Sequence, residues 1–158
     1  MGRANREDQS VFYASLGGPA AFFEIKAKPG DLIALAEWEI TESLWMHNLG
    51  FDEVALRRLG DRLYPRPQLT NLIPHETKRN RKLGRKLSRA FTENLTPENE
   101  HRYKQSIAIN ELLFDGAAPM PIRAGGPQFE YVAGIVYPAM QMRGAADNVM
   151  IYPRYVAV

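Results

Sequence analysis

Three side chains near the start of the chain have the types and the spacing to carry chemistry. Arg3 is followed ten residues later by Tyr13, inside a strand-like run, and Glu24 follows eleven residues after that, beside two phenylalanines. Charged and hydroxylated side chains on apolar elements cost desolvation free energy unless they are paired or used. Their proximity in the sequence therefore indicates a site.

Each of these side chains suits one part of a nucleotide. The planar guanidinium of Arg3 can contact two oxygens of a phosphate or pyrophosphate at once. Tyr13 can stack on a flat ring and hydrogen-bond through its hydroxyl. Glu24, partly desolvated by Phe22 and Phe23, is an electrostatic partner for a developing cation. NAD+ meets all three requirements, because it has phosphates, a flat base and a sugar carbon that can become an oxocarbenium ion.

A more ordinary interpretation of the same residues stays open at this point. Arg3 and Glu24 would then form a salt bridge at the surface, and Tyr13 would fill the core. Spacing alone favours this interpretation, because surface ion pairs and core tyrosines are common in folded domains.

The first half of the chain contains two strand-like runs around a short helix. Residues 10–16 predict a strand, and Pro19 suits the first turn of a helix after a Gly-Gly turn. Residues 31–41 predict a second strand, apolar on both faces at its start as a central strand would be. Residues 51–60 predict one or two helical turns, and the three prolines of 64–74 exclude a regular helix there.

The second half predicts two helices, a loop and two strands. The basic segment 78–89 continues as a helix into a phenylalanine, and 96–114 predicts the next helix. Residues 115–128 form a Gly/Pro-rich loop, expected to be exposed and mobile, before the strand-like runs 129–139 and 148–156. The order of elements predicts one α+β domain whose mixed sheet joins strands from both ends of the chain.

Composition narrows the class of protein. The chain has 158 residues, 45% of them hydrophobic and 24% charged, which fits one soluble domain over 1–158. No apolar run is long enough for a membrane span, and the polar start is not typical of a signal peptide. The absence of cysteine excludes disulfides and thiol nucleophiles, which fits a cytoplasmic protein. No metal-site spacing, GxSxG elbow or P-loop is present.

The charge is unevenly distributed although its formal sum is only +2. The segment 78–89 holds seven lysines and arginines and no acidic residue. Such a block can contact nucleic acid or another polyanion, although a solvated helix face is the commoner interpretation.

The opening segment "RAN…FYASLGGPAAFFEI" resembles the start of the RES domain, a family named for an arginine, a glutamate and a serine. The family pattern has Arg-x-Asn, then a strand with a tyrosine, then a short helix that leads to a glutamate. Arg3, Asn5, Tyr13 and Glu24 fall on these positions. The later stretches "YKQSIAINELLF" and "GIVYPAMQMRGAADNVMIYP" are also similar to the family, so the resemblance covers nearly the whole chain.

The resemblance implies an enzyme with an ADP-ribosyltransferase-like core. RES-domain proteins are typically toxins of bacterial toxin–antitoxin pairs that consume NAD+ by hydrolysis or phosphorolysis, and some transfer ADP-ribose to a protein. By this resemblance Arg3 holds a phosphate of the substrate and Tyr13 orients the nicotinamide. Glu24 stabilises the ribosyl cation or positions the incoming water or phosphate.

The substrate-binding set implied by the family also includes Asn5, Tyr137 and the position of Ala139. The family's serine falls at Ala139, and a methyl group cannot donate the hydrogen bond of a hydroxyl. This departure puts the rate or the choice of substrate in doubt more than binding.

The resemblance also implies partners. NAD+ is the substrate, no cofactor or metal is required, and inorganic phosphate is a possible second substrate. A cognate antitoxin, of helix-turn-helix type in many pairs, is expected to block the cleft. No contact with a membrane and no direct contact with nucleic acid are expected. Two alternatives stay open: a degenerate domain that binds a nucleotide or a protein without turnover, and a nucleic-acid-binding module that uses 78–89.

Overall fold

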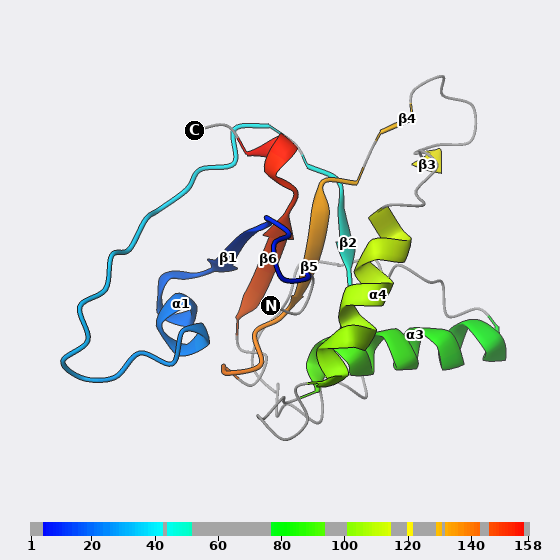
Figure 1. Cartoon of the computed structure of the whole chain (residues 1–158). Helices are drawn as coiled ribbons and strands as arrows, with labels where there is room; N and C mark the ends of the chain where they lie inside the picture. Colours follow the sequence, from blue (N-terminus) through cyan, green and yellow to red (C-terminus); the bar gives the residue numbers. More distant parts are fainter. Residues whose placement is uncertain are drawn as a thin grey trace.

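A computed structural model describes residues 5–42, 44–51, 77–93, 101–114, 120–121, 129–130, 132–142 and 146–156 of the chain. These residues form a mixed α/β protein with a four-stranded mixed sheet, a two-stranded ribbon and three α-helices (Figure 1). The elements in chain order are β1 (Phe12–Leu16), α1 (Gly18–Glu24), β2 (Met46–Asn48), α3 (Lys78–Thr92), α4 (Tyr103–Phe114), β3 (Met120–Pro121), β4 (Phe129–Glu130), β5 (Gly134–Pro138), β6 (Asp147–Ile151) and the 3-10 helix η2 (Pro153–Tyr155).

The main sheet joins the two ends of the chain, as the sequence predicts. Its strand order is β1-β6-β5-β2. β6 pairs antiparallel with both neighbours, so Met150 lies opposite Tyr13 on β1 and opposite Ile135 on β5. β2 adds to the other edge of β5 in parallel. The first strand of the chain therefore depends on the last for its hydrogen bonds.

β5 is the most enclosed strand of the sheet. All of its five residues are buried, which fits the apolar sequence GIVYP and its place between two other strands. Its first residue, Gly134, faces the Met150 carbonyl so closely that an added Cβ would lie 1.9 Å from that oxygen. Glycine is required there because any side chain would collide with the backbone of β6.

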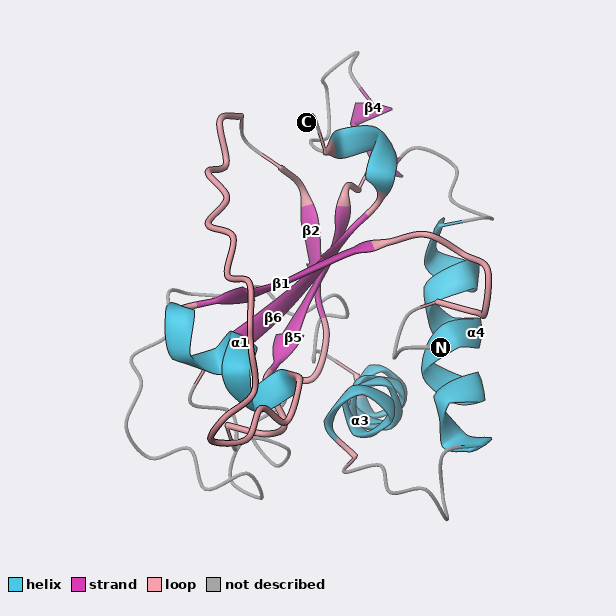
Figure 2. Cartoon of the chain, turned by 60° about the vertical axis from the view of Figure 1, so that its left-hand side comes forward, coloured by secondary structure: helices cyan, strands magenta, loops and turns pink. Residues whose placement is uncertain are grey.

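Two apolar clusters lie on the two faces of the sheet. The first cluster consists of Leu49, Phe91, Ile135, Tyr137 and Met150, and side chains of α4 pack against it. The second consists of Phe51, Val136, Val149 and Ile151, with Phe12, Ala14 and Leu44 against it. Figure 2 shows α3 and α4 to one side of the strands, and α1 with the long loop after it to the other. Among the described residues, none of the helices has both the length and the apolar character to span a membrane.

The strand predicted over 31–41 is wrong. This segment is extended but belongs to no helix or strand, and Leu32, Leu35 and Ile40 are exposed. Trp38 holds it near β1 through an edge-to-face contact with Phe12, with ring centroids 5.0 Å apart. The apolar pattern shows that these residues are compatible with the buried face of a sheet. A strand also needs a neighbouring strand with an unpaired edge, which the pattern does not reveal.

Other predictions differ only in their boundaries or fall outside the description. The strand β2 is missing from the prediction, because the signals around 41–62 are mixed. The second long helix is confirmed from Tyr103 onward. Residues 51–60 lie outside the described part except for Phe51, and 64–74 lie outside it entirely. Of the predicted loop 115–128, only β3 is described, and it pairs with β4.

Phe91 joins α3 to the sheet and provides a test of this packing. It is completely buried, and the centroid of its ring lies 5.8 Å from the centroid of the Tyr137 ring. We expect Phe91→Ala to lower the free energy of unfolding by about 3–5 kcal/mol, the usual cost of deleting a buried aromatic ring. Leu83→Ala is the matched control on the same helix, because Leu83 is 46% exposed. Urea denaturation of both variants measures the difference, and equal losses would contradict this packing.

His47 is a buried titratable group in β2. It is 8% exposed, and burial lowers the pKa of its imidazole from the ordinary value of 6.5. Its neighbour Met46 lines a cavity on one face of the sheet, so strand alternation directs His47 to the face that α3 and α4 cover.

This lowered pKa predicts that acid weakens the fold. The unfolded chain takes up a proton at His47 near pH 6.5, whereas the folded chain takes it up only at lower pH. The contribution of His47 to the free energy of unfolding is therefore complete above pH 6.5. It is lost as the pH falls toward the lowered pKa, and the free energy of unfolding then changes by at most about 1.4 kcal/mol per pH unit. Urea denaturation between about pH 5 and 8 should show a shallower pH dependence in His47→Gln. The control His101→Gln makes the same substitution at an exposed position, and an equal change of slope in both variants would contradict the role of His47.

Candidate functional site

The structure brings together two of the residues that the family pattern selects. The Tyr13 hydroxyl donates a hydrogen bond to Asn5 Oδ1 at 3.0 Å, and Tyr13 is 40% exposed. The Asn5 amide donates to the carbonyls of Gln9 at 2.9 Å and of Arg6 at 3.1 Å. These bonds fix which way the Asn5 amide faces, so its oxygen is directed at the tyrosine. Arg3 lies outside the described residues.

The turn that carries Asn5 is anchored to α4. Arg6 Nη2 donates to Glu111 Oε2 at 2.6 Å, and a second close contact joins Arg6 Nε to Glu111 Oε1. Two parallel contacts between a guanidinium and a carboxylate fix the orientation as well as the distance. The N-terminal turn is thus held beside β1 by a helix from the second half of the chain.

A second polar pair follows on the same strand. Ser15 Oγ donates to Asn148 Oδ1 at 2.8 Å, and Asn148 is 4% exposed. In register, Ser15, Asn148 and Tyr137 lie side by side across β1, β6 and β5. Tyr13 is two residues from Ser15, so both project from one face of β1. Sequence reasoning missed this pair, although the alternation within 10–16 already puts Ser15 on the face of Tyr13.

Glu24 is the last residue of α1, the short helix that follows β1 directly. Its Oε1 is buried and has no hydrogen-bond partner among the residues that the structure describes. The neighbouring phenylalanines do not enclose it as the sequence suggests, since Phe22 is 38% and Phe23 53% exposed. No hydrogen bond or ion pair within the described part joins Glu24 to Tyr13 or Asn5.

Tyr137 and Ala139 are packed inside the protein. Tyr137 is 5% exposed and belongs to the cluster around Phe91. Ala139 is fully buried, and its N–H donates to the Ala146 carbonyl at 2.8 Å. Neither side chain reaches the surface, so contact with a ligand requires a rearrangement of the residues above them.

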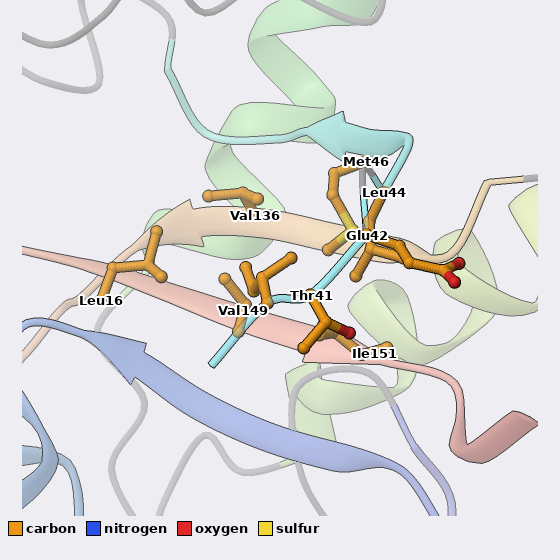
Figure 3. Close-up of a pocket in the computed structure, with 9 residues that line it drawn as sticks. Leu16, Thr41, Glu42, Leu44, Met46, Val136, Val149 and Ile151 are labelled. Atoms are coloured by element: carbon orange, nitrogen blue, oxygen red, sulfur yellow. The ribbon is translucent and has the colours of Figure 1, made fainter. Parts of the chain in front are cut away.

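A cavity of 390 Å³ lies on the other face of the sheet, between β5, β6 and the segment that leads into β2 (Figure 3). Most of its lining is aliphatic, and the polar contributions come from Thr41 and Glu42. None of Asn5, Tyr13 and Glu24 lines it. Leu16, which does, is the last residue of β1 and precedes the helix that carries Glu24.

The arrangement offers hydrogen-bond groups, an accessible aromatic ring and a carboxylate. Among the described residues, no three His, Asp or Glu side chains lie close enough together to hold a metal ion. The chemistry that these groups can perform is orientation of a polar ligand and electrostatic stabilisation of a cation.

Comparison of the chain with family models, with curated proteins and with solved structures finds no match.

The Ser15–Asn148 pair can be tested through stability. Ser15→Ala removes the donor to a buried amide oxygen, and we expect a loss of about 1–3 kcal/mol in the free energy of unfolding. The exposed Ser10 gives a matched control, because Ser10→Ala changes the same atoms outside the sheet. Chemical denaturation measures both. A loss no larger for Ser15 than for Ser10 would show that the pair does not stabilise the strand.

Proposed function

We propose that this chain cleaves the N-glycosidic bond of NAD+ and releases nicotinamide, with Glu24 as the group that stabilises the ribosyl cation. The observation that supports this most is the buried Glu24 oxygen with no hydrogen-bond partner among the described residues. The sequence resemblance to RES-domain proteins supplies the substrate and the reaction class.

A buried carboxylate oxygen without a donor is costly. Leaving such an acceptor unsatisfied costs about 1–3 kcal/mol or more, because it gives up its hydrogen bonds to water. An ionised carboxylate can only accept, so a ligand that brings a hydroxyl donor or a positive charge would recover this cost. A ribose ring offers both, first through its hydroxyl groups and then through the cation that forms at C1′.

The reaction needs few groups from the protein. The bond between C1′ and the nicotinamide nitrogen breaks, and its electron pair leaves with nicotinamide as a neutral molecule. The positive charge then lies on the ribose C1′ and its ring oxygen, near the Glu24 carboxylate. Water or inorganic phosphate attacks C1′, and a proton is released to solvent when water is the nucleophile. Preorganised electrostatic stabilisation of this kind is worth several kcal/mol.

Tyr13 and Asn5 act in this proposal as the binding pair. The ring of Tyr13 is accessible enough to stack on the nicotinamide, while its hydroxyl is held by Asn5. Tyr13 lies on the α3/α4 side of β1 and α1 lies on the other, so in this proposal the substrate reaches both around the edge strand β1. Arg3 is assigned to the substrate phosphates by the resemblance alone. The proposal assigns Tyr137 and Ala139 no direct contact with NAD+, because both are buried.

The wider assignment follows from the resemblance and belongs to the same proposal. It describes a cytoplasmic toxin with an ADP-ribosyltransferase-like core that needs no cofactor. Its expected protein partner is a cognate antitoxin, of helix-turn-helix type in many such pairs.

The direct test is nicotinamide release from NAD+, followed by chromatography with and without inorganic phosphate. Glu24→Gln keeps the shape of the side chain but removes its charge, and we expect release to fall by about 10²- to 10³-fold. Glu39→Gln is the matched control, because Glu39 is exposed in the loop after α1. Phosphate dependence of the wild-type rate would distinguish phosphorolysis from hydrolysis.

Two outcomes would contradict the proposal. Unchanged release in Glu24→Gln would remove this residue from the mechanism. Binding of NAD+ without release by the folded wild-type chain would favour the degenerate binding domain, for which Ala139 in place of the family's serine is the motivating observation.

A further inference from the structure

The basic segment of the sequence forms most of α3. Seven of the fifteen residues of this helix are lysine or arginine, and none is acidic. All seven are exposed: Lys78, Arg79, Arg81, Lys82, Arg85, Lys86 and Arg89. With 3.6 residues per turn, they occupy one continuous arc of about 160° along a helix about 22 Å long.

The opposite side of α3 is used for packing. Ser88 and Phe91 are buried, and Phe91 enters the cluster on the sheet. The helix is capped at its start, where the Thr77 hydroxyl accepts from the Asn80 N–H at 3.1 Å. Figure 1 shows α3 below α4, extending to the right away from the strands. The cap and the buried side therefore hold the basic arc in a fixed orientation toward solvent.

The positive charges of α3 have few partners in the part of the chain that the structure describes. Among the described residues, Arg89 is the only one of the seven in an ion pair, with Glu93 at 3.9 Å. Lys82 and Lys86 lie four residues apart, as do Arg81 and Arg85, so like charges repel along the helix. Lys78 and Arg79 stand in the first turn, where the helix dipole disfavours cations. A bound polyanion would relieve all of these unfavourable interactions together.

We propose that the basic face of α3 binds the phosphate backbone of double-stranded DNA without sequence preference. A polyanion with closely spaced charges matches seven cations within a few turns, since the duplex carries one charge per about 1.7 Å of its axis. The diameter of an α-helix also fits the major groove of B-form DNA.

The composition of the face favours a duplex over other polyanions. Single strands are held by aromatic side chains that stack on the bases, and the segment 78–89 contains none. The major groove of double-stranded RNA is too narrow for a helix to enter. A membrane-surface helix needs a free apolar face, whereas Phe91 and Ala90 of α3 pack against the sheet and Leu83 is the one large apolar side chain of the helix that is exposed. This inference does not depend on the proposed NAD+ chemistry.

Fluorescence anisotropy with a labelled duplex of about 20 base pairs, between about 50 and 300 mM KCl, tests the proposal. The full chain should bind two unrelated duplex sequences equally, with a dissociation constant of about 10⁻⁴ to 10⁻⁶ M near physiological salt. The variant Lys82→Gln/Arg85→Gln/Lys86→Gln should reduce the slope of log K against log salt by about 2–3, because each lost phosphate contact removes up to about 0.9. Glutamine keeps a good helix propensity, and circular dichroism checks the fold.

The control Lys26→Gln/Lys28→Gln/Lys104→Gln removes the same charge from exposed positions outside α3. It should keep the wild-type slope. No duplex binding at the lowest salt, or equal losses in the two triple variants, would overturn the proposal. Tighter binding to single-stranded DNA, to double-stranded RNA, to polyglutamate or to anionic vesicles than to the duplex would overturn it in favour of that partner.

Discussion

The backbone contact between β5 and β6 at Gly134 and Met150 is the constraint on which the remaining architecture depends. Only a residue without a side chain allows the two strands to approach there, because a Cβ would lie 1.9 Å from the Met150 oxygen. The contact sets the register of β6, and β6 in turn sets the register of β1. A one-residue slip would move every side chain of a strand to the other face of the sheet.

This register decides where the candidate site lies. Tyr13 and Ser15 face the side of the sheet covered by α3 and α4, opposite Met150 and Asn148. Asn5 reaches Tyr13 because Arg6 is fastened to Glu111 on α4. The N-terminal turn, a central strand and a helix from the second half must all form before these groups can meet. The site is therefore a property of the tertiary structure, although its residues are close in the sequence.

The prediction from the sequence succeeded for elements with strong local signals. It failed where the position of neighbouring strands decides whether a segment becomes a strand. Pro19 after a Gly-Gly pair identified α1, and the apolar run at Ile135 identified β5. The segment 31–41 is apolar enough for a strand, but the edge that would receive it cannot be deduced from its own residues. β2 has only three residues, so it is specified by its parallel contact with β5 more than by propensity.

The residues of the candidate site were likewise predicted only in part. The resemblance selected Asn5 and Tyr13, and the structure joins them by a hydrogen bond. Tyr137, selected in the same way, lies in the core, because its place on a central strand leaves no side open to solvent. Burial of a strand residue depends on what covers each face of the sheet, which local sequence does not specify.

Two features of the described structure are unfavourable when each is considered alone. The Glu24 oxygen is buried without a donor among the described residues, and the cations of α3 repel one another along one face. Local conflicts of this kind are expected where a binding partner resolves them. The two features belong to different elements, α1 beside the first strand and α3 packed through Phe91. Because no described residue contributes to both, ligand chemistry at Glu24 and polyanion binding at α3 can be altered separately by mutation.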